Sequence, residues 1–288
     1  MRDDAFRRGF DVAPGYEVIG HLSRGNDLDV YDVWSERRGC RCIAKTPRPS
    51  RVGDTQVTAR LLEEGGRLQH LTHPHIVRAY ETRETPRPVA ILETLGGETL
   101  AHMVESSGPL DAAECVHLGL QLGSAVRYLN AQGILHLDLK PSNVIAEAGR
   151  AKLLDLSVAR PHGVMRAGLG TWCYMAPEQV RGGVIDAAAD VWGLGVVLFE
   201  AASGDPPFDD PGSDESGSGH GFDDARFRQG LEHAPRLHDV EGVSGALADL
   251  VATCLAIDPA ARPTIEEVLA ALERCSDLPA PERRWGAP

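Results

Sequence analysis

The sequence predicts an α+β fold in which a β-rich N-terminal part precedes a mainly helical part. Short strand-like apolar runs lie before residue 94, whereas the best helical pattern, residues 111–130, lies after it. Between these two regions, the adjacent glycines 96 and 97 interrupt the chain just after an apolar run. We therefore expect a small β-rich lobe, a hinge at 94–97 and a larger helical lobe.

The composition narrows the class of protein. The 288 residues are 42% hydrophobic and 25% charged, which is typical of a soluble globular protein. No apolar run reaches the roughly 18–20 residues of a membrane span, and the N-terminus lacks a signal-peptide pattern, so we expect a cytoplasmic protein or fragment. A net charge of −13 argues against nucleic acid or an anionic membrane as the main partner. The six cysteines are scattered and predict free thiols.

Four strands are expected in the N-terminal part. Tyr16–Leu22 and Asp29–Trp34 alternate apolar and polar residues and flank a hairpin turn that contains Gly25. Cys40–Lys45 forms a third strand that ends in a lysine, and Pro88–Glu93 forms a fourth. Taken alone, the turn is an ordinary β-turn and the lysine a solvent-facing side chain.

Helical patterns separate and follow these strands. Leucines at 61, 68 and 71 have helical spacing and place Glu64 on the same segment. The adjacent glycines 65 and 66 should lower the intrinsic stability of this helix by roughly 1 kcal/mol each, which favours a movable helix. A second helix, 111–130, begins with Asp111 and Glu114 in the spacing of a capping box.

The most informative stretch, Ile134–Asn143, concentrates polar groups after apolar residues. Asp138, Lys140 and Asn143 lie within six residues, and Asp155 follows twelve residues after Asn143. A polar turn between two strands is the alternative interpretation, because Asp, Pro, Ser and Asn are common turn residues.

Three further motifs lie in the C-terminal half: Gly170–Glu178, Asp190–Gly195 and Asp258–Thr264. A last helix is expected from about Thr264 to Arg274. Residues 209–224 are rich in Asp, Gly and Ser and predict a flexible acidic insertion, either an attractor of basic substrates or a merely solvated loop. Cys173 lies within the first motif, where it is either reactive or simple filler.

In this order, the motifs resemble those of eukaryotic-type (Hanks-type) serine/threonine protein kinases of bacteria. The resemblance covers roughly Tyr16 to Arg274 and includes the elements H-x-D-x-K-x-x-N and G-T-x-x-Y-M-A-P-E. It implies the two-lobed protein-kinase fold with ATP in the cleft. On this basis a single kinase domain is expected at 1–275, with an N-lobe at 12–93, a C-lobe at 98–275 and a tail at 276–288.

The resemblance also implies residue roles and cofactors. Asp138 would align the substrate hydroxyl, and Lys140 would offset charge on the γ-phosphoryl group. Asn143 and Asp155 would bind Mg²⁺ or Mn²⁺. The implied catalytic set is Asp138, Lys140, Lys45, Glu64 and Thr171. The implied ATP-binding set is Leu22, Ser23, Gly25, Val30, Ala44, Lys45, Leu92, Glu93, Leu95, Asn143, Ile145 and Asp155.

Two structural pairings follow from the same resemblance. Asp190 would brace the catalytic loop from below, and Arg262 would pair with Glu178. Lys140 and Thr171 point to serine or threonine as the acceptor in a protein substrate.

The chain departs from the family pattern at several positions. Gly25 alone remains of the three lid glycines, and Leu156 and Ser157 replace the Phe and Gly of D-F-G. These departures keep open a pseudokinase that binds nucleotide or acts as a scaffold. A small-molecule kinase is a further alternative, disfavoured by the intact A-P-E element.

Leu137 is the departure with a regulatory consequence. In many kinases an arginine at this position docks a phosphate on the activation loop. Leucine cannot bind phosphate, and residues 158–170 contain no Ser, Thr or Tyr. The sequence therefore predicts activity that does not depend on activation-loop phosphorylation.

Overall fold

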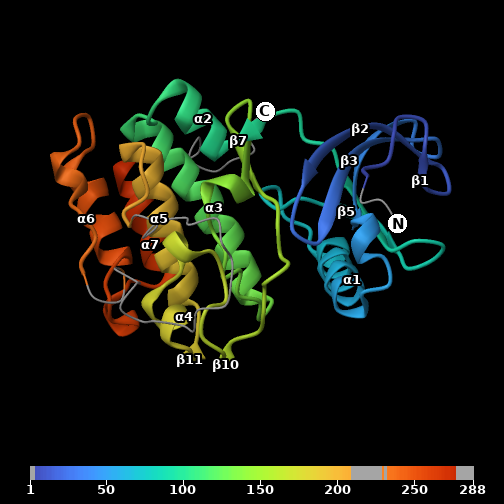
Figure 1. Cartoon of the computed structure of the whole chain (residues 1–288). Helices are drawn as coiled ribbons and strands as arrows, with labels where there is room; N and C mark the ends of the chain where they lie inside the picture. Colours follow the sequence, from blue (N-terminus) through green and yellow to red (C-terminus); the bar gives the residue numbers. More distant parts are fainter. Residues whose placement is uncertain (1–3, 209–228, 230–231, 277–288) are drawn as a thin grey trace. The chain divides into compact units, whose positions relative to one another are not determined.

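The chain divides into two units, which a computed structural model describes for residues 4–208, 229 and 232–276 (Figure 1). The first unit contains the residues up to Gly96 together with Asp155–Ser157, and the second unit contains the rest. The chain passes from one to the other between Gly96 and Gly97. The predicted insertion at 209–224 lies outside the described residues, as does the tail after Ser276.

A six-stranded antiparallel sheet in the order β1-β2-β3-β4-β6-β5 makes up most of the first unit (Figure 1). All four predicted strands are present, and two short ones extend the edges. The strands are β1 (Asp11–Ala13), β2 (Tyr16–Arg24), β3 (Leu28–Ser35), β4 (Cys40–Pro47), β5 (Ala79–Arg83) and β6 (Val89–Glu93). Because successive side chains alternate between faces, one face collects a buried core that includes Tyr31, Val33, Cys42, Ala44 and Ile91.

Helix α1 (Thr55–His70) packs against β5 and β6 of this sheet. The side chain of Asp54 caps its first turn by accepting hydrogen bonds from the amides of Gln56 (3.0 Å) and Val57 (3.2 Å). Gly65 faces the sheet so closely that a Cβ atom there would overlap Cγ2 of Thr82. The glycine that weakens the isolated helix is therefore what allows the helix to approach the sheet.

Helices dominate the second unit, which together with the sheet of the first confirms the α+β class. Helix α3 begins at the predicted capping box of Asp111 and Glu114 and packs on α5 and α7, while α5 contacts α6. Helix α5 is buried along most of its length. The helices are α2 (Leu100–Ser107), α3 (Ala112–Ala131), α4 (Pro177–Arg181), α5 (Ala188–Ser203), α6 (Gly245–Cys254) and α7 (Ile265–Cys275).

Two small antiparallel sheets complete the second unit. One joins β7 (Glu98–Thr99), β8 (Val144–Glu147) and β9 (Arg150–Leu153), and the other pairs β10 (Gly163–Met165) with β11 (Gly183–Ile185). Short 3₁₀ turns occur at 49–51, 141–143, 172–174, 237–239 and 259–261. Within the described part of the chain, no helix combines the length and apolar character needed to cross a bilayer.

The two adjacent glycines of α1 provide a test of this packing. We expect Gly65→Ala to destabilise the protein by about 1–3 kcal/mol because its Cβ would overlap Thr82. Gly66→Ala, whose Cβ meets nothing within 4 Å, should stabilise it by up to about 1 kcal/mol through helix propensity. Urea unfolding of the two variants measures both changes.

A rescue variant separates overlap from other causes. Thr82→Ser removes the overlapping methyl group but keeps the hydroxyl that accepts a hydrogen bond from Gln69. Adding it to Gly65→Ala should restore most of the lost stability. Equal effects of alanine at positions 65 and 66 would contradict the packing argument.

Candidate active site

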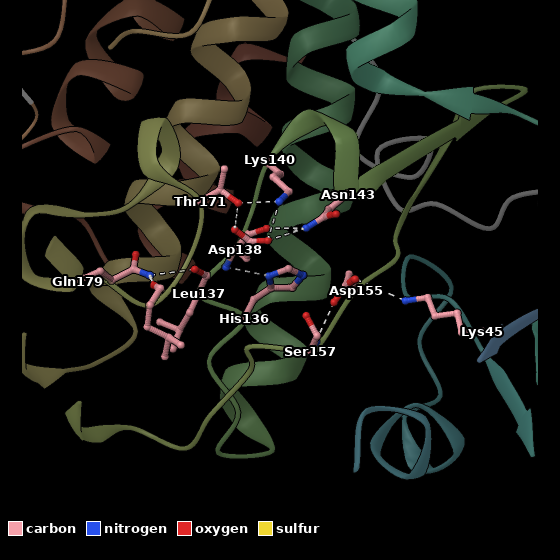
Figure 2. Close-up of polar contacts among 11 residues, drawn as sticks. Lys45, His136, Leu137, Asp138, Lys140, Asn143, Asp155, Ser157, Thr171 and Gln179 are labelled. Atoms are coloured by element: carbon pink, nitrogen blue, oxygen red, sulfur yellow. Dashed lines mark hydrogen bonds and ion pairs between the residues drawn. The ribbon is translucent and has the colours of Figure 1, made fainter. Parts of the chain in front are cut away.

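Lys45 and Glu64 form a buried ion pair in the first unit. Lys45 lies on the central strand β4 and Glu64 on the inner face of α1, with Nζ 2.8 Å from Oε1. A second carboxylate, that of Asp155, lies 3.4 Å from the same Nζ (Figure 2). Burial opposes the charge of Lys45, but the two carboxylates outweigh it and raise the pKa of the ammonium group. Lys45 therefore remains a fixed positive charge throughout the physiological pH range.

A cavity of about 310 Å³ opens beside this ion pair. Six residues of the predicted set line it: Ser23, Gly25, Val30, Lys45, Glu64 and Asp155. The other residues that line it are Asn26, Asp27, Leu28, Val57, Arg60, Leu61 and Ser157. The cavity thus has two cationic residues, Lys45 and Arg60, and several other polar groups on walls formed mainly by β2, β3, β4 and α1.

The hairpin turn at one side of this cavity is tied to its surroundings. The guanidinium of Arg48 donates to the carbonyls of Gly25 (3.4 Å) and Asn26 (3.3 Å). Asp27 forms ion pairs with Arg51 (3.3 Å) and Arg60 (3.7 Å), the latter on α1. Sequence patterns did not indicate these contacts, because they join a turn to residues far along the chain.

Asp155 is held by its own loop. The amide of Ser157 donates to Oδ1 of Asp155 at 2.7 Å, and the side chain of Leu156 is buried. Among the described non-glycine residues, positive φ occurs at Leu137 and Ala148, so Ser157 occupies its position without left-handed backbone. The replacement of glycine at this position is therefore accommodated without strain.

Four polar side chains form a closed cluster in the second unit (Figure 2). The hydroxyl of Thr171 donates to Oδ1 of Asp138 (2.7 Å) and accepts from Nζ of Lys140 (2.6 Å). Lys140 also lies 2.9 Å from Oδ2 of Asp138. Nδ2 of Asn143 donates to the backbone carbonyl (3.0 Å) and Oδ2 (3.1 Å) of Asp138. The Asp138 carboxylate is thus oriented by three donors, from its own loop and from Thr171.

The backbone of this loop is anchored to α5 through Asp190. The buried Asp190 carboxylate accepts from the amides of His136 (2.9 and 3.1 Å) and Leu137 (2.9 Å) and from Nδ2 of Asn130 (3.0 Å). These contacts confirm the predicted bracing role of Asp190. Leu137 itself is buried and adopts a left-handed backbone with φ of 64°, a conformation that costs a non-glycine residue about 1–2 kcal/mol.

Glu178 and Arg262 form the predicted ion pair. Two parallel hydrogen bonds join Nη1 to Oε1 (2.6 Å) and Nη2 to Oε2 (2.8 Å). The guanidinium also donates to the carbonyls of Ala256 (2.8 Å) and Ala188 (2.9 Å) and lies 5.0 Å from the centre of the Trp192 ring. The side chain of Arg262 is 0% exposed, so these acceptors replace its hydration entirely.

The structure corrects one predicted ATP-binding residue, Ala44. Ala44 is buried in the sheet core with Cys42 and Tyr31, on the opposite face of β4 from Lys45. Ile43, two positions before Lys45, shares the face of the lysine, because side chains alternate along a strand.

The remaining predicted residues lie outside the cavity lining. Leu22, Glu93 and Leu95 are not among the residues that line it, and Leu22 is 55% exposed. Leu92 is buried and pairs with Ile43 across β4 and β6, which places it on the Lys45 face of the sheet. Ile145 is half-buried on β8 in the second unit.

Gln179 is a further residue that the sequence motifs did not single out. Its buried side chain bonds to Leu137, directly before Asp138 (Figure 2). It also bonds to Leu169, two residues before Thr171. A glutamine directly after A-P-E was the available signal, but its partners are backbone carbonyls, which leave no trace in the sequence.

Comparison with known proteins identifies the family. Residues 16–272 match the protein kinase domain, and the chain belongs to this family. It is 31% identical over 205 residues to the serine/threonine-protein kinase PknB of Mycobacterium leprae, a match that covers 67% of this chain and 33% of that protein. PknB of Mycobacterium tuberculosis H37Ra is 32% identical over 206 residues, again 67% of this chain and 33% of the relative.

A relative from another genus gives the same result. The probable serine/threonine-protein kinase SCO3848 of Streptomyces coelicolor is 31% identical over 206 residues, with coverage of 67% of this chain and 31% of the relative. The match spans about a third of the length of each of these curated relatives.

The Glu178–Arg262 pair gives a stability prediction. Arg262→Met should cost about 3–5 kcal/mol, because it leaves the Glu178 carboxylate and three backbone carbonyls without this donor. In thermal unfolding this corresponds to a fall in Tm of about 10 °C. Arg51→Met, at an arginine whose side chain is 48% exposed, is the matched control and should cost less than about 1 kcal/mol. Similar losses in the two variants would contradict the assigned importance of the buried pair.

Proposed function

We propose that this chain is a serine/threonine protein kinase domain that transfers the γ-phosphoryl group of ATP to a protein hydroxyl group. The observation that carries the proposal is the closed cluster of Asp138, Lys140, Asn143 and Thr171. It holds a carboxylate and an ammonium group within 2.9 Å of each other in fixed geometry. Membership in the kinase family and the names of the relatives support the same activity.

The residues present fit ATP with a divalent cation. The side-chain nitrogen of Asn143 donates hydrogen bonds to Asp138, so the side-chain oxygen is the atom that could bind a metal ion. That oxygen and the Asp155 carboxylate are the hard ligands that Mg²⁺ or Mn²⁺ prefers. A bound cation would offset negative charge on the phosphates. The cavity beside Lys45 would receive the phosphates, with the lysine as their fixed cationic partner.

The chemical role of each residue follows from its charge and partners. Asp138 would accept a hydrogen bond from the substrate hydroxyl, align its oxygen and receive its proton as the phosphate bond forms. Lys140 would balance charge that develops on the transferred group. Thr171 would hold the side chains of Asp138 and Lys140 in place through its hydroxyl group. Glu64 would keep the Lys45 ammonium oriented.

A second candidate function is nucleotide binding or scaffolding without turnover. One observation favours it: the hairpin turn retains a single glycine, and Asp27 ties it to Arg51 and Arg60. A turn held in this way departs from a freely closing glycine-rich lid. Against this alternative, every charged group that phosphoryl transfer requires is present.

The deciding experiment is a radiolabelled-ATP assay with Mg²⁺ or Mn²⁺ and candidate acceptor proteins. We expect the parent to label serine or threonine and both Asp138→Asn and Asp155→Ala to lose at least about 100-fold. Thr171→Val should lose activity because it lacks the bridging hydroxyl, whereas Thr171→Ser keeps the hydroxyl and most of the rate. Equal labelling by parent, Asp138→Asn and Asp155→Ala would refute the enzyme, and labelling of small molecules alone would indicate another acceptor class.

We also propose that activity does not depend on phosphorylation of the activation segment, residues 155–178. Leu137 is buried and carries no charge, so it cannot dock a phosphate. Phosphatase treatment of the purified protein should therefore change its rate by less than about twofold. Mass spectrometry that finds an activating phosphate between Asp155 and Glu178 would contradict the proposal.

A further inference from the structure

The side chain of Gln179 bonds to three separate parts of the second unit. Nε2 donates to the carbonyls of Leu137 (2.8 Å) and Leu169 (2.7 Å), and Oε1 accepts from the amide of Ala176 (3.0 Å). The backbone carbonyl of Gln179 accepts from the amide of Gly168 (2.8 Å). The residue is 2% exposed, so water does not compete for these bonds.

These bonds flank the two residues that meet in the polar cluster. Leu137 precedes Asp138, and Leu169 lies two residues before Thr171, whose hydroxyl donates to the Asp138 carboxylate. Gln179 therefore fixes the distance between two backbone segments that are more than 30 positions apart in the sequence. A small shift of either segment would separate the hydroxyl from the carboxylate.

The glycine at position 170 makes this close approach possible because it has no Cβ atom. Gly170 has φ of +131°, and a Cβ there would lie 2.8 Å from the Leu137 carbonyl oxygen and 3.2 Å from Nε2 of Gln179. Leu137 is also held from the other side, where its backbone amide donates to Asp190. Its left-handed backbone persists because bonds on both sides over-determine it.

We infer that Gln179 is a positioning residue that holds the segment of residues 168–171 against the loop of residues 136–138. Its uncharged amide supplies two N–H donors and one oxygen acceptor to backbone groups. The apolar side chain of Leu137 can supply neither. The inference rests on the proposed function only for its kinetic consequence. The geometric part concerns the order of the two segments and holds whatever the substrate.

A change from glutamine to glutamate shows whether the hydrogen bonds of Gln179 matter or only the space that its side chain fills. Glutamate has the same shape, but its carboxylate cannot donate to two carbonyl oxygens. Burial and those oxygens would raise the pKa of a glutamate placed here. As pH falls, the carboxyl group would gain a proton and could again donate a hydrogen bond to one of the two backbone carbonyls. The activity of Gln179→Glu relative to the parent should therefore rise as pH falls.

Gln121 offers a matched control. It is also buried and also bridges backbone groups, with Nε2 donating to the Gly149 carbonyl (2.9 Å) and Oε1 accepting from the Ala151 amide (2.6 Å). Its partners belong to the turn and strand after β8, away from Asp138 and Thr171. Gln121→Glu makes the same chemical change in a comparable environment.

The first measurement is the rate of protein phosphorylation from pH 6 to pH 8.5, at a temperature at which circular dichroism shows each variant to be folded. We expect kcat of Gln179→Glu to fall about 50-fold at pH 8 and the deficit to shrink at least about fivefold at pH 6. KM for ATP should change less than about threefold, and Gln121→Glu should stay within about threefold of the parent throughout. A pH-independent deficit in Gln179→Glu, or an equal one in Gln121→Glu, would overturn the inference.

The second measurement needs no activity. Amide hydrogen exchange of Gln179→Met should accelerate at least about tenfold in the segments 168–171 and 136–138, and Gln121→Met should not affect them. If the parent fails to phosphorylate any protein, the proposed function fails and the exchange result alone decides the inference. Unchanged exchange at 136–138 in Gln179→Met would overturn it.

Discussion

The buried carboxylate of Asp190 is the interaction on which the polar cluster of the second unit depends. It satisfies the backbone amides of His136 and Leu137, which lie in the interior and would otherwise lack acceptors. By fixing these amides it fixes the direction in which the next residue, Asp138, leaves the core. Helix α5 can serve as this anchor because it is buried along most of its length. A buried helix thus determines the position of the loop that carries Asp138.

Charge is arranged differently in the two units. In the first, Lys45 stands between two carboxylates in a largely buried site, and the net result favours its charged form. In the second, the Asp138 carboxylate is surrounded by neutral and cationic donors. The first arrangement suits a cation that must remain charged, and the second suits a carboxylate that must remain oriented.

The fold class followed from the order of strands and helices. Spacing alone did not indicate the ion pairs of Asp27 with Arg51 and Arg60. The resemblance to the kinase family implied the Glu178–Arg262 pair, which the structure contains. It was wrong at Ala44, because strand side chains alternate and an error of one position moves a residue to the opposite face. It missed Gln179 and the packing of Gly65, since these depend on where backbone carbonyls and neighbouring strands lie after folding. Such partners have no characteristic residue type.

The left-handed backbone at Leu137 limits which side chains this position can hold. The side chain is buried in the interior, so an arginine placed there would bury a guanidinium, which is costly without a paired carboxylate. Residues 158–170 also contain no hydroxyl side chain that could carry a phosphate. An arginine at position 137 would need a second substitution that supplies a buried carboxylate beside it.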